Sequence, residues 1–192
     1  MQGTFLRRGD TVSLTEKVPN LTAVTIRFGW DLRGTDGDFD LDASAIMVDS
    51  KGMVLSSEHF VFFNNLRSPE GSVVHSGDFP TGEDEAYDNA IKVNLAAVPG
   101  AVEKIVLPVS VYDAESRMQT FRQVKRAFIR IVDPSNNLEV ASYDLADDAA
   151  SPYTALVFGE LYRRRRGWDF RGGGKGYTSG LWGVARDHGV NV

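Results

Sequence analysis

Aspartates alternate with small or apolar residues in the segment Asp36-Gly37-Asp38-Phe39-Asp40-Leu41-Asp42-Ala43. In an extended chain, successive side chains point to opposite faces, so this spacing puts the carboxylates on one face and Phe39 and Leu41 on the other. Neighbouring carboxylates repel each other, and a hard divalent cation with oxygen ligands relieves that repulsion. Calcium fits better than magnesium, because it accepts six to eight oxygens from flexible loops. The alternation therefore predicts a calcium site.

The negative charge is concentrated in two segments. Six of the 26 acidic residues lie between Asp31 and Asp49, and five lie between Asp78 and Asn89. The first segment is not an EF-hand, because with Asp36 as the first ligand the sixth position is Leu41 instead of Gly. A purely structural alternative stays open, in which an acidic edge strand and a solvated loop prevent aggregation.

The overall composition excludes several classes of protein. The chain has 192 residues, no cysteine and a formal net charge of −5. An acidic balance argues against nucleic-acid binding, and the lack of cysteine excludes disulfide scaffolds, thiolate zinc sites and iron–sulfur clusters. No segment approaches the ~20 apolar residues of a membrane span, and the N-terminus lacks the features of a secretory signal. We expect a cytoplasmic protein without a transmembrane segment, and peripheral attachment to a membrane stays open.

The elements that must position the acidic segments are mostly strands. Apolar residues of period two recur in short segments separated by Gly, Pro, Asn and Asp, which favours a β-sandwich of two antiparallel sheets in a single domain, residues 1–192. Two stretches predict short helices, Asp113–Val124 and Leu181–His188. The expected strands are Ala23–Trp30, Ala43–Val48, His59–Phe63, Ser72–His75, Ala90–Leu95, Lys104–Tyr112, Phe128–Val132, Glu139–Tyr143 and Thr154–Tyr162.

Three other groups of residues are better explained by structure than by chemistry. Gly172–Gly176 is similar to a phosphate loop but lacks Walker A spacing and a Ser or Thr after Lys175, so we interpret it as a turn. The run Arg163–Arg166 has the chemistry to hold a phosphate or an anionic lipid, yet we expect a solvated turn. The histidines, His59, His75 and His188, lack metal-ligand spacing.

Paired carboxylates also serve as catalysts of hydrolysis. A catalytic site needs an activated water or nucleophile and a group that stabilises the developing charge. No basic or hydroxyl residue is interleaved with the aspartates of the first acidic segment. We therefore predict no catalytic residues and no enzymatic activity.

Motifs that follow one another along nearly the whole chain give a more specific signal. With these motifs the chain resembles the TerD family of bacterial tellurite- and stress-resistance proteins. The resemblance implies a β-sandwich that binds calcium at one end through acidic loops, in cytoplasmic proteins without an established catalytic activity. The motifs include Gly29-Trp30-Asp31, Asp38-Phe39-Asp40-Leu41-Asp42-Ala43, Phe62-Phe63-Asn64-Asn65, Ser72-Val73-Val74-His75-Ser76-Gly77-Asp78 and Phe158-Gly159-Glu160-Leu161-Tyr162-Arg163.

The resemblance also implies a set of metal ligands and a departure from the family pattern. Where the family usually has Gly-Asp-Asp-Glu, this chain has Ala86-Tyr87-Asp88-Asn89. Calcium affinity depends on the number of charged ligands, so one of two expected ions is weakened or lost. The first-rank ligands are Asp38, Asp40, Asp42, Asn64, Asn65 and Asp78, and the second-rank ligands are Asp36, Glu83 and Asp88.

The main hypothesis is a non-enzymatic protein in which one or two Ca²⁺ ions order the acidic loops and so shape a surface that binds protein partners. We expect these partners to be other stress-resistance proteins. A second hypothesis is a metal-independent interaction module whose acidic end docks a basic partner. A third, by analogy only, is calcium-bridged attachment to anionic lipid.

Overall fold

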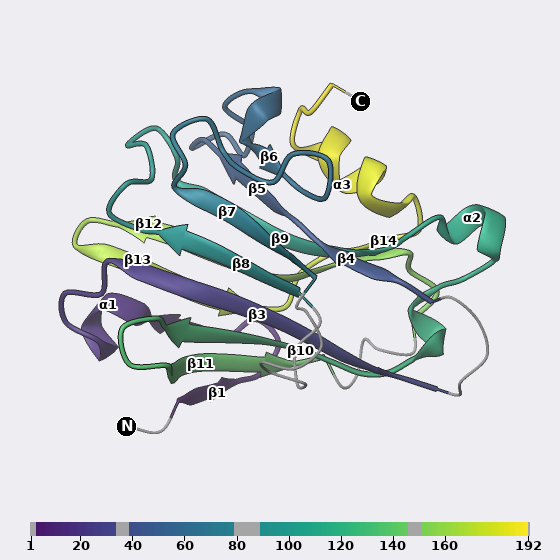
Figure 1. Ribbon diagram of the computed structural model, residues 1–192, viewed down its shortest axis with the longest axis horizontal. Coiled ribbons are helices and arrows are strands. Elements are labelled where there is room, and N and C mark those ends of the chain that lie inside the picture. The colour runs from purple at the N-terminus through teal and green to yellow at the C-terminus, as the bar shows by residue number, and fades with distance from the viewer. Residues whose placement is uncertain (1–2, 34–38, 79–88, 146–150, 192) are drawn as a thin grey trace.

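Two β-sheets pack face to face in the computed structural model, which describes residues 3–33, 39–78, 89–145 and 151–191 (Figure 1). The expectation of a β-sandwich is confirmed, and all nine expected strands are present. The strand Ala23–Leu32 shows why the alternation was informative: Val24, Ile26 and Phe28 are each at most 1% exposed and point between the sheets.

The first sheet has six strands, and every pairing in it is antiparallel except that of β1 with β11. Its spatial order is β1 (Thr4–Leu6), β11 (Leu138–Asp144), β10 (Val124–Asp133), β3 (Ala23–Leu32), β8 (Asn89–Asn94) and β7 (Val73–Asp78).

The second sheet has eight strands and is antiparallel throughout its described pairings. Its main path runs through β2 (Thr11–Ser13), β13 (Gly167–Gly172), β12 (Ala155–Arg164), β9 (Lys104–Val111), β5 (Ala45–Val48) and β6 (Phe60–Val61), while β14 (Gly176–Tyr177) pairs with β12 and β4 (Leu41–Ala43) pairs with β9.

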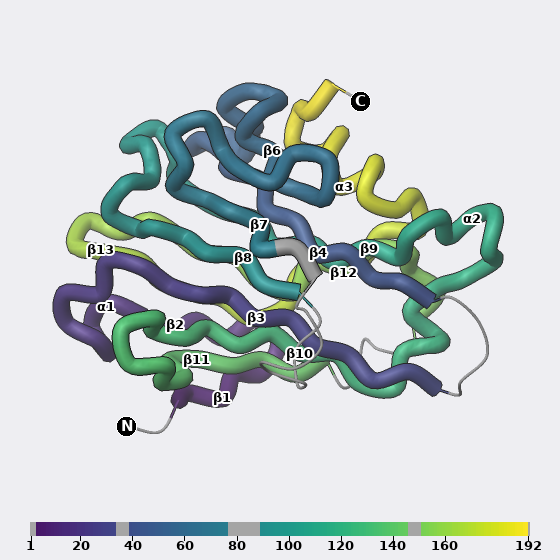
Figure 2. The backbone as a smooth tube through the Cα atoms, viewed as in Figure 1, coloured from purple at the N-terminus to yellow at the C-terminus, as the bar shows by residue number. Residues whose placement is uncertain are grey.

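The N-terminal residues contribute an edge strand to each sheet (Figure 2). β1 lies beside β11 at the edge of the six-stranded sheet, and β2 lies beside β13 at the edge of the eight-stranded sheet. Neither strand was expected from the sequence, because each is three residues long and carries no alternating pattern of its own. The start of the chain therefore covers two strand edges that are formed much later in the sequence.

Helices are short, and the first of them contributes Leu14 to the core between the sheets. Among the described residues they are α1 (Leu14–Lys17), α2 (Ala114–Arg117) and α3 (Gly180–Asp187), with single 3-10 turns at Ser57–His59 and Phe121–Gln123. α3 confirms the helix expected at Leu181–His188. The helix expected over Asp113–Val124 is instead divided, because Met118 adopts a left-handed conformation (φ 51°) that ends α2 after one turn.

Apolar side chains form two clusters. The larger lies between the sheets and includes Phe28, Phe121 and Phe158, all fully buried. The smaller lies on the outward face of the eight-stranded sheet, where α3 places Val184 and Ala185 over Val157. Because this outward face is partly covered by a helix, it is not a plain solvent-facing sheet surface. No helix among the described residues is long and apolar enough to cross a membrane.

Candidate metal centre

Two aspartates of the first acidic segment lie at strand β4, Asp42 within the strand and Asp40 directly before it. Leu41 is 1% exposed and Phe39 packs against the core, as the alternation predicts. Asp42 is half-buried and lies opposite Ser110 of β9, while Asp40 is exposed and accepts a hydrogen bond on its backbone oxygen from the N–H of Tyr112 at 2.9 Å. β4 and the residue before it therefore carry two carboxylates on a backbone that is hydrogen-bonded to β9 and to Tyr112.

β4 is held at its last residue by side chains from the other sheet. The Oδ1 atom of Asn89, on β8, accepts a hydrogen bond from the N–H of Ala43 at 2.8 Å, and Nε2 of His75, on β7, lies 3.1 Å from the Ala43 carbonyl oxygen. Because a carbonyl oxygen only accepts, that His75 nitrogen is the donor. Asn89 and His75 are 2% and 6% exposed. The two buried bonds fix the backbone next to Asp42.

The same contacts bring Asp78 toward this end of β4. Asp78 pairs with Asn89 across β7 and β8, and Asn89 in turn bonds to Ala43. In Figure 1 the end of β7, the start of β8 and the strand β4 converge. The backbone position of Asp78 is thus described, whereas Asp36, Asp38, Glu83 and Asp88 lie outside the described residues.

The Asn64-Asn65 pair lies in a tight turn that contacts the same region through aromatic rings. The backbones of Phe62 and Asn65 bond to each other in both directions, and Nδ2 of Asn65 donates to the carbonyl oxygens of Glu58 and Phe60 at 2.9 and 2.7 Å. The ring of Phe63 lies 6.3 Å, centroid to centroid and edge-on, from the ring of Tyr112. Since the Tyr112 N–H bonds to Asp40, this turn and β4 are neighbours.

Two other acidic residues of the first segment, Asp49 and Asp31, make contacts that stabilise the fold. Asp49 accepts from the N–H groups of Met53 and Lys51 at 3.0 and 2.8 Å, and these donors, led by Met53, lower the pKa of its carboxyl. Asp31 lies opposite Arg126 in the β3–β10 pairing. The pKa of Arg126 is raised first by its hydrogen bond to Asp144 and also by the charge of Asp31. The acidity of the segment therefore has more than one cause.

The donor types at this end fit calcium. Carboxylate oxygens at Asp40 and Asp42 and amide oxygens in the Asn64-Asn65 turn are the hard ligands that Ca²⁺ takes. Among the described residues no group of three or more acidic or histidine side chains is gathered. Asn89, the last residue of the motif that departs from the family pattern, has a structural role, because its Oδ1 accepts the Ala43 N–H in a buried bond. This role was missed because it joins positions 46 residues apart.

The basic run Arg163–Arg166 is a solvated turn only in part. The expectation of a solvated turn holds for Arg165 and Arg166, which form the turn between β12 and β13. It is wrong for Arg163, whose guanidinium donates to the carbonyl oxygens of Val102, Val98 and Pro99 at 2.7 to 3.0 Å. Its guanidinium carbon also lies 4.6 Å from the centre of the Trp168 ring.

Comparison with known families and proteins gives a consistent result. The family model described as the TerD domain matches residues 2–188. The chain is 48% identical to tellurium resistance protein TerD of Alcaligenes sp, over 97% of each chain. It is 46% identical to general stress protein 16U of Bacillus subtilis, also over 97% of each chain.

Solved structures have the same fold at lower sequence identity. A homologue of telluride resistance protein from Streptomyces coelicolor superposes with a TM-score of 0.67 and 20% identity, covering 86% of this chain and 96% of that one. A protein of unknown function, SAV2460, gives a TM-score of 0.68 and 23% identity, covering 86% of this chain and 95% of that one. The two sheets described above are thus an arrangement found in solved structures.

Proposed function

Because the chain belongs to the TerD family of tellurium- and stress-resistance proteins, we propose that it is a non-enzymatic, cytoplasmic calcium-binding protein that acts through protein partners. One or two Ca²⁺ ions would bind between the acidic loops at the β4 end, with Asp40 and Asp42 as the described carboxylate ligands. The observation that carries the proposal is the pair of buried hydrogen bonds at Ala43, whose N–H donates to Asn89 and whose carbonyl oxygen accepts from His75.

Those bonds support metal binding because they fix the backbone beforehand, so less conformational entropy is lost when an ion binds. Hydrogen bonds to both the N–H and the carbonyl oxygen of Ala43 hold the neighbouring Asp42 in place before an ion binds. Calcium affinity rises with the rigidity of the site. Asp42 is attached to one sheet and Asn89 to the other. An ion bound here would therefore link the ends of both sheets to the loops between their strands.

The test is a thermal melt of chelator-stripped protein with Ca²⁺ or Mg²⁺ added. A ligand at about 1,000 times its dissociation constant adds about 4 kcal/mol to the free energy of unfolding. At about 2–4 °C per kcal/mol for a chain of this size, the expected rise in Tm is roughly 8–16 °C with Ca²⁺ and much smaller with Mg²⁺.

Matched variants locate the effect. We expect the double substitution Asp40→Asn, Asp42→Asn to abolish most of the calcium-dependent rise in Tm, because it removes two anionic ligands and keeps their size. Glu16→Gln, which removes a charge from the exposed first turn of α1, should leave the rise unchanged. Direct titration of Ca²⁺ by calorimetry checks the same result without relying on unfolding.

A metal-independent interaction module is the second candidate, and one observation favours it. Phe63 and Tyr112 are each 45% exposed beside β4, so apolar surface lies next to the acidic residues, as at many protein contacts. No change in Tm with Ca²⁺ up to millimolar concentration, and no heat of binding, would exclude the calcium proposal and leave this alternative.

A further inference from the structure

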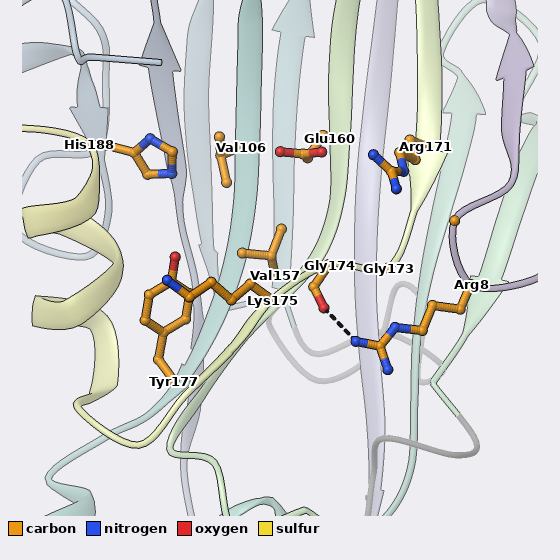
Figure 3. A pocket seen from close by; sticks show the side chains of 11 residues that line it. Arg8, Val106, Val157, Glu160, Arg171, Gly173, Gly174, Lys175, Tyr177 and His188 are labelled. Atoms are coloured by element: carbon orange, nitrogen blue, oxygen red, sulfur yellow. Dashed lines mark hydrogen bonds between the residues drawn. The ribbon is translucent and has the colours of Figure 1, made fainter. Parts of the chain in front are cut away.

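A cavity of about 440 Å³ opens on the outward face of the eight-stranded sheet, in a part of the molecule that the calcium proposal does not use (Figure 3). Its volume falls within the ~300–1,000 Å³ range of small-molecule sites. Its wall combines apolar, acidic and basic residues from five segments of the chain: residues 8–9, 106, 157–160, 171–177 and 188.

The floor of the cavity is set by strand register. Glu160 on β12 lies between Val106 on β9 and Arg171 on β13, its partners in the two antiparallel pairings. Glu160 accepts hydrogen bonds from Lys104 at 2.9 Å and from the Tyr162 hydroxyl. Lys104 is not part of the cavity wall, so the charge of Glu160 is already balanced from outside the cavity.

Glycines let one wall of the cavity lie close to the sheet. The chain after β13 runs so close to its neighbours that a Cβ at Gly173 would lie 2.9 Å from Cγ of Arg8, and one at Gly174 would lie 2.8 Å from Cβ of Val157. Gly173 also has a φ of +78°, a conformation that favours glycine. The glycine run that the sequence indicated as a turn therefore forms a thin wall against the sheet.

Two guanidinium groups lie on one side of Glu160 in Figure 3. Nη2 of Arg8 donates to the Gly174 carbonyl oxygen at 3.1 Å, which ties the N-terminal loop to the glycine wall. Nη2 of Arg171 lies 3.9 Å from the position that a Cβ on Gly9 would take, so its guanidinium reaches the residue next to Arg8. Guanidinium groups are suited to bind phosphate through paired N–H donors.

The opposite side of Glu160 carries Lys175, Tyr177 and His188 (Figure 3). Asp187 binds both the Lys175 ammonium at 2.6 Å and the Tyr177 hydroxyl at 3.0 Å, which positions the two side chains at the rim. Nδ1 of His188 donates to the Gly52 carbonyl oxygen at 2.7 Å, and so its other ring nitrogen, Nε2, is the one left to contact a ligand.

We propose that this cavity binds a small phosphorylated molecule. Arg8 and Arg171 hold the phosphate, while Val106, Val157 and the Tyr177 ring contact the body of the ligand and Glu160 accepts hydrogen bonds from its hydroxyl or amino groups. Arg8 and Arg171 face one carboxylate, Glu160, whose charge is balanced by Lys104, while the charge of Lys175 is balanced by Asp187. The cavity therefore carries two positive charges in excess, in a chain whose net charge is −5. A local excess of positive charge in an acidic protein favours an anionic ligand.

Isothermal titration calorimetry at low ionic strength, in the presence of chelator, tests the proposal separately from calcium binding. The probes are ribose 5-phosphate, adenosine 5′-monophosphate, their unphosphorylated counterparts ribose and adenosine, and inorganic phosphate. We expect at least one of the two phosphorylated probes to bind, its counterpart and inorganic phosphate to bind at least tenfold more weakly, and Arg8→Gln or Arg171→Gln to weaken binding at least tenfold.

The control removes the same charge from the same sheet. Arg165→Gln and Arg166→Gln change the turn between β12 and β13, whose residues do not line the cavity, and should leave the affinity unchanged. Absence of binding, equal affinity for inorganic phosphate, or an equal loss in the control variants would overturn the proposal. Backbone amide shifts on titration of the unsubstituted protein give a second readout, since changes centred on residues 172–177 are required whether or not a variant folds.

Discussion

Asn89 and Ala43 are joined by a hydrogen bond of 2.8 Å that crosses from the six-stranded sheet to the eight-stranded sheet. Its acceptor is the side-chain oxygen of the first residue of β8, and its donor is the backbone N–H of the last residue of β4. Both residues are buried. The bond sets the position of β4, and through β4 it sets the position of the aspartates that precede Ala43.

Loss of this acceptor is expected to destabilise the fold. In Asn89→Ala the Ala43 N–H stays buried without its acceptor, which costs about 1–3 kcal/mol. Urea denaturation followed by circular dichroism would measure the change in the free energy of unfolding. Lys92→Ala, at an exposed position of the same strand, should change it by less than about 0.5 kcal/mol. Equal stability of Asn89→Ala and the parent protein would contradict the structural role given to Asn89.

Arg163 is expected to matter far more than its neighbours in the basic run. Its guanidinium satisfies three carbonyl oxygens in the loop before β9 and covers Trp168. We expect Arg163→Met to lower the free energy of unfolding by at least ~1.5–3 kcal/mol, the contribution typical of a hydrogen bond to a charged group. The same substitution at Arg165, in the turn, removes one charge without these contacts. Similar stabilities of the two variants would show that the loop does not depend on Arg163.

Asp144 is expected to contribute to acid sensitivity. Burial alone would raise the pKa of its carboxyl, but the ion pair with Arg130 at 2.5 Å and the hydrogen bonds from Arg126 outweigh burial and lower that pKa below its usual value. A carboxyl with a lowered folded-state pKa stabilises the fold above its unfolded-state pKa, and this contribution is lost as the pH falls through the folded-state pKa. Urea midpoints measured from pH 7 to pH 2.5 should fall less steeply in the acid range for Asp144→Asn. An unchanged pH dependence would rule out this source.

Gly173 and Gly100 form a matched pair for testing the glycine wall of the cavity. Gly173→Ala forces a side chain into a left-handed conformation, at a cost of roughly 1–2 kcal/mol, and places its Cβ 2.9 Å from Cγ of Arg8. Gly100 has no atom within 4 Å of its would-be Cβ, so Gly100→Ala should be neutral or slightly stabilising. The melting temperatures of the two variants provide the comparison. Equal values would indicate that the wall tolerates side chains.

The sequence predicted the parts of this fold that repeat a local pattern. β3 alternates over ten residues, and Phe39 and Leu41 pack inward where the aspartates point outward. β13 was missed although Trp168 and Phe170 are buried, because two aromatic positions among glycines and arginines are too short a pattern. Local periodicity thus located the strands with a clear alternation and overlooked the edge strands β1 and β2 and the internal strand β13.

The acidic residues of the candidate site could be predicted from the sequence, but the hydrogen bonds that hold them in position could not. The alternation at Asp40 and Asp42 is visible in the sequence. The hydrogen bonds between Ala43 and the side chains of Asn89 and His75 join residues that are 46 and 32 positions apart. Such contacts depend on how two sheets are stacked, and no short-range spacing encodes them. The same holds for the cavity, since the approach of Arg8 to Gly174 spans 166 positions.

The two edge strands at the start of the chain impose an order on synthesis. Thr4 pairs with Ala141 and Ser13 pairs with Asp169, so β1 and β2 have no partners until β11 and β13 have been translated. At about 5–20 residues per second, β1 waits roughly 7–30 seconds for β11 to be made. During that time the segment is available to ribosome-associated chaperones, and the two sheet edges can close only after β11 and β13 have been made.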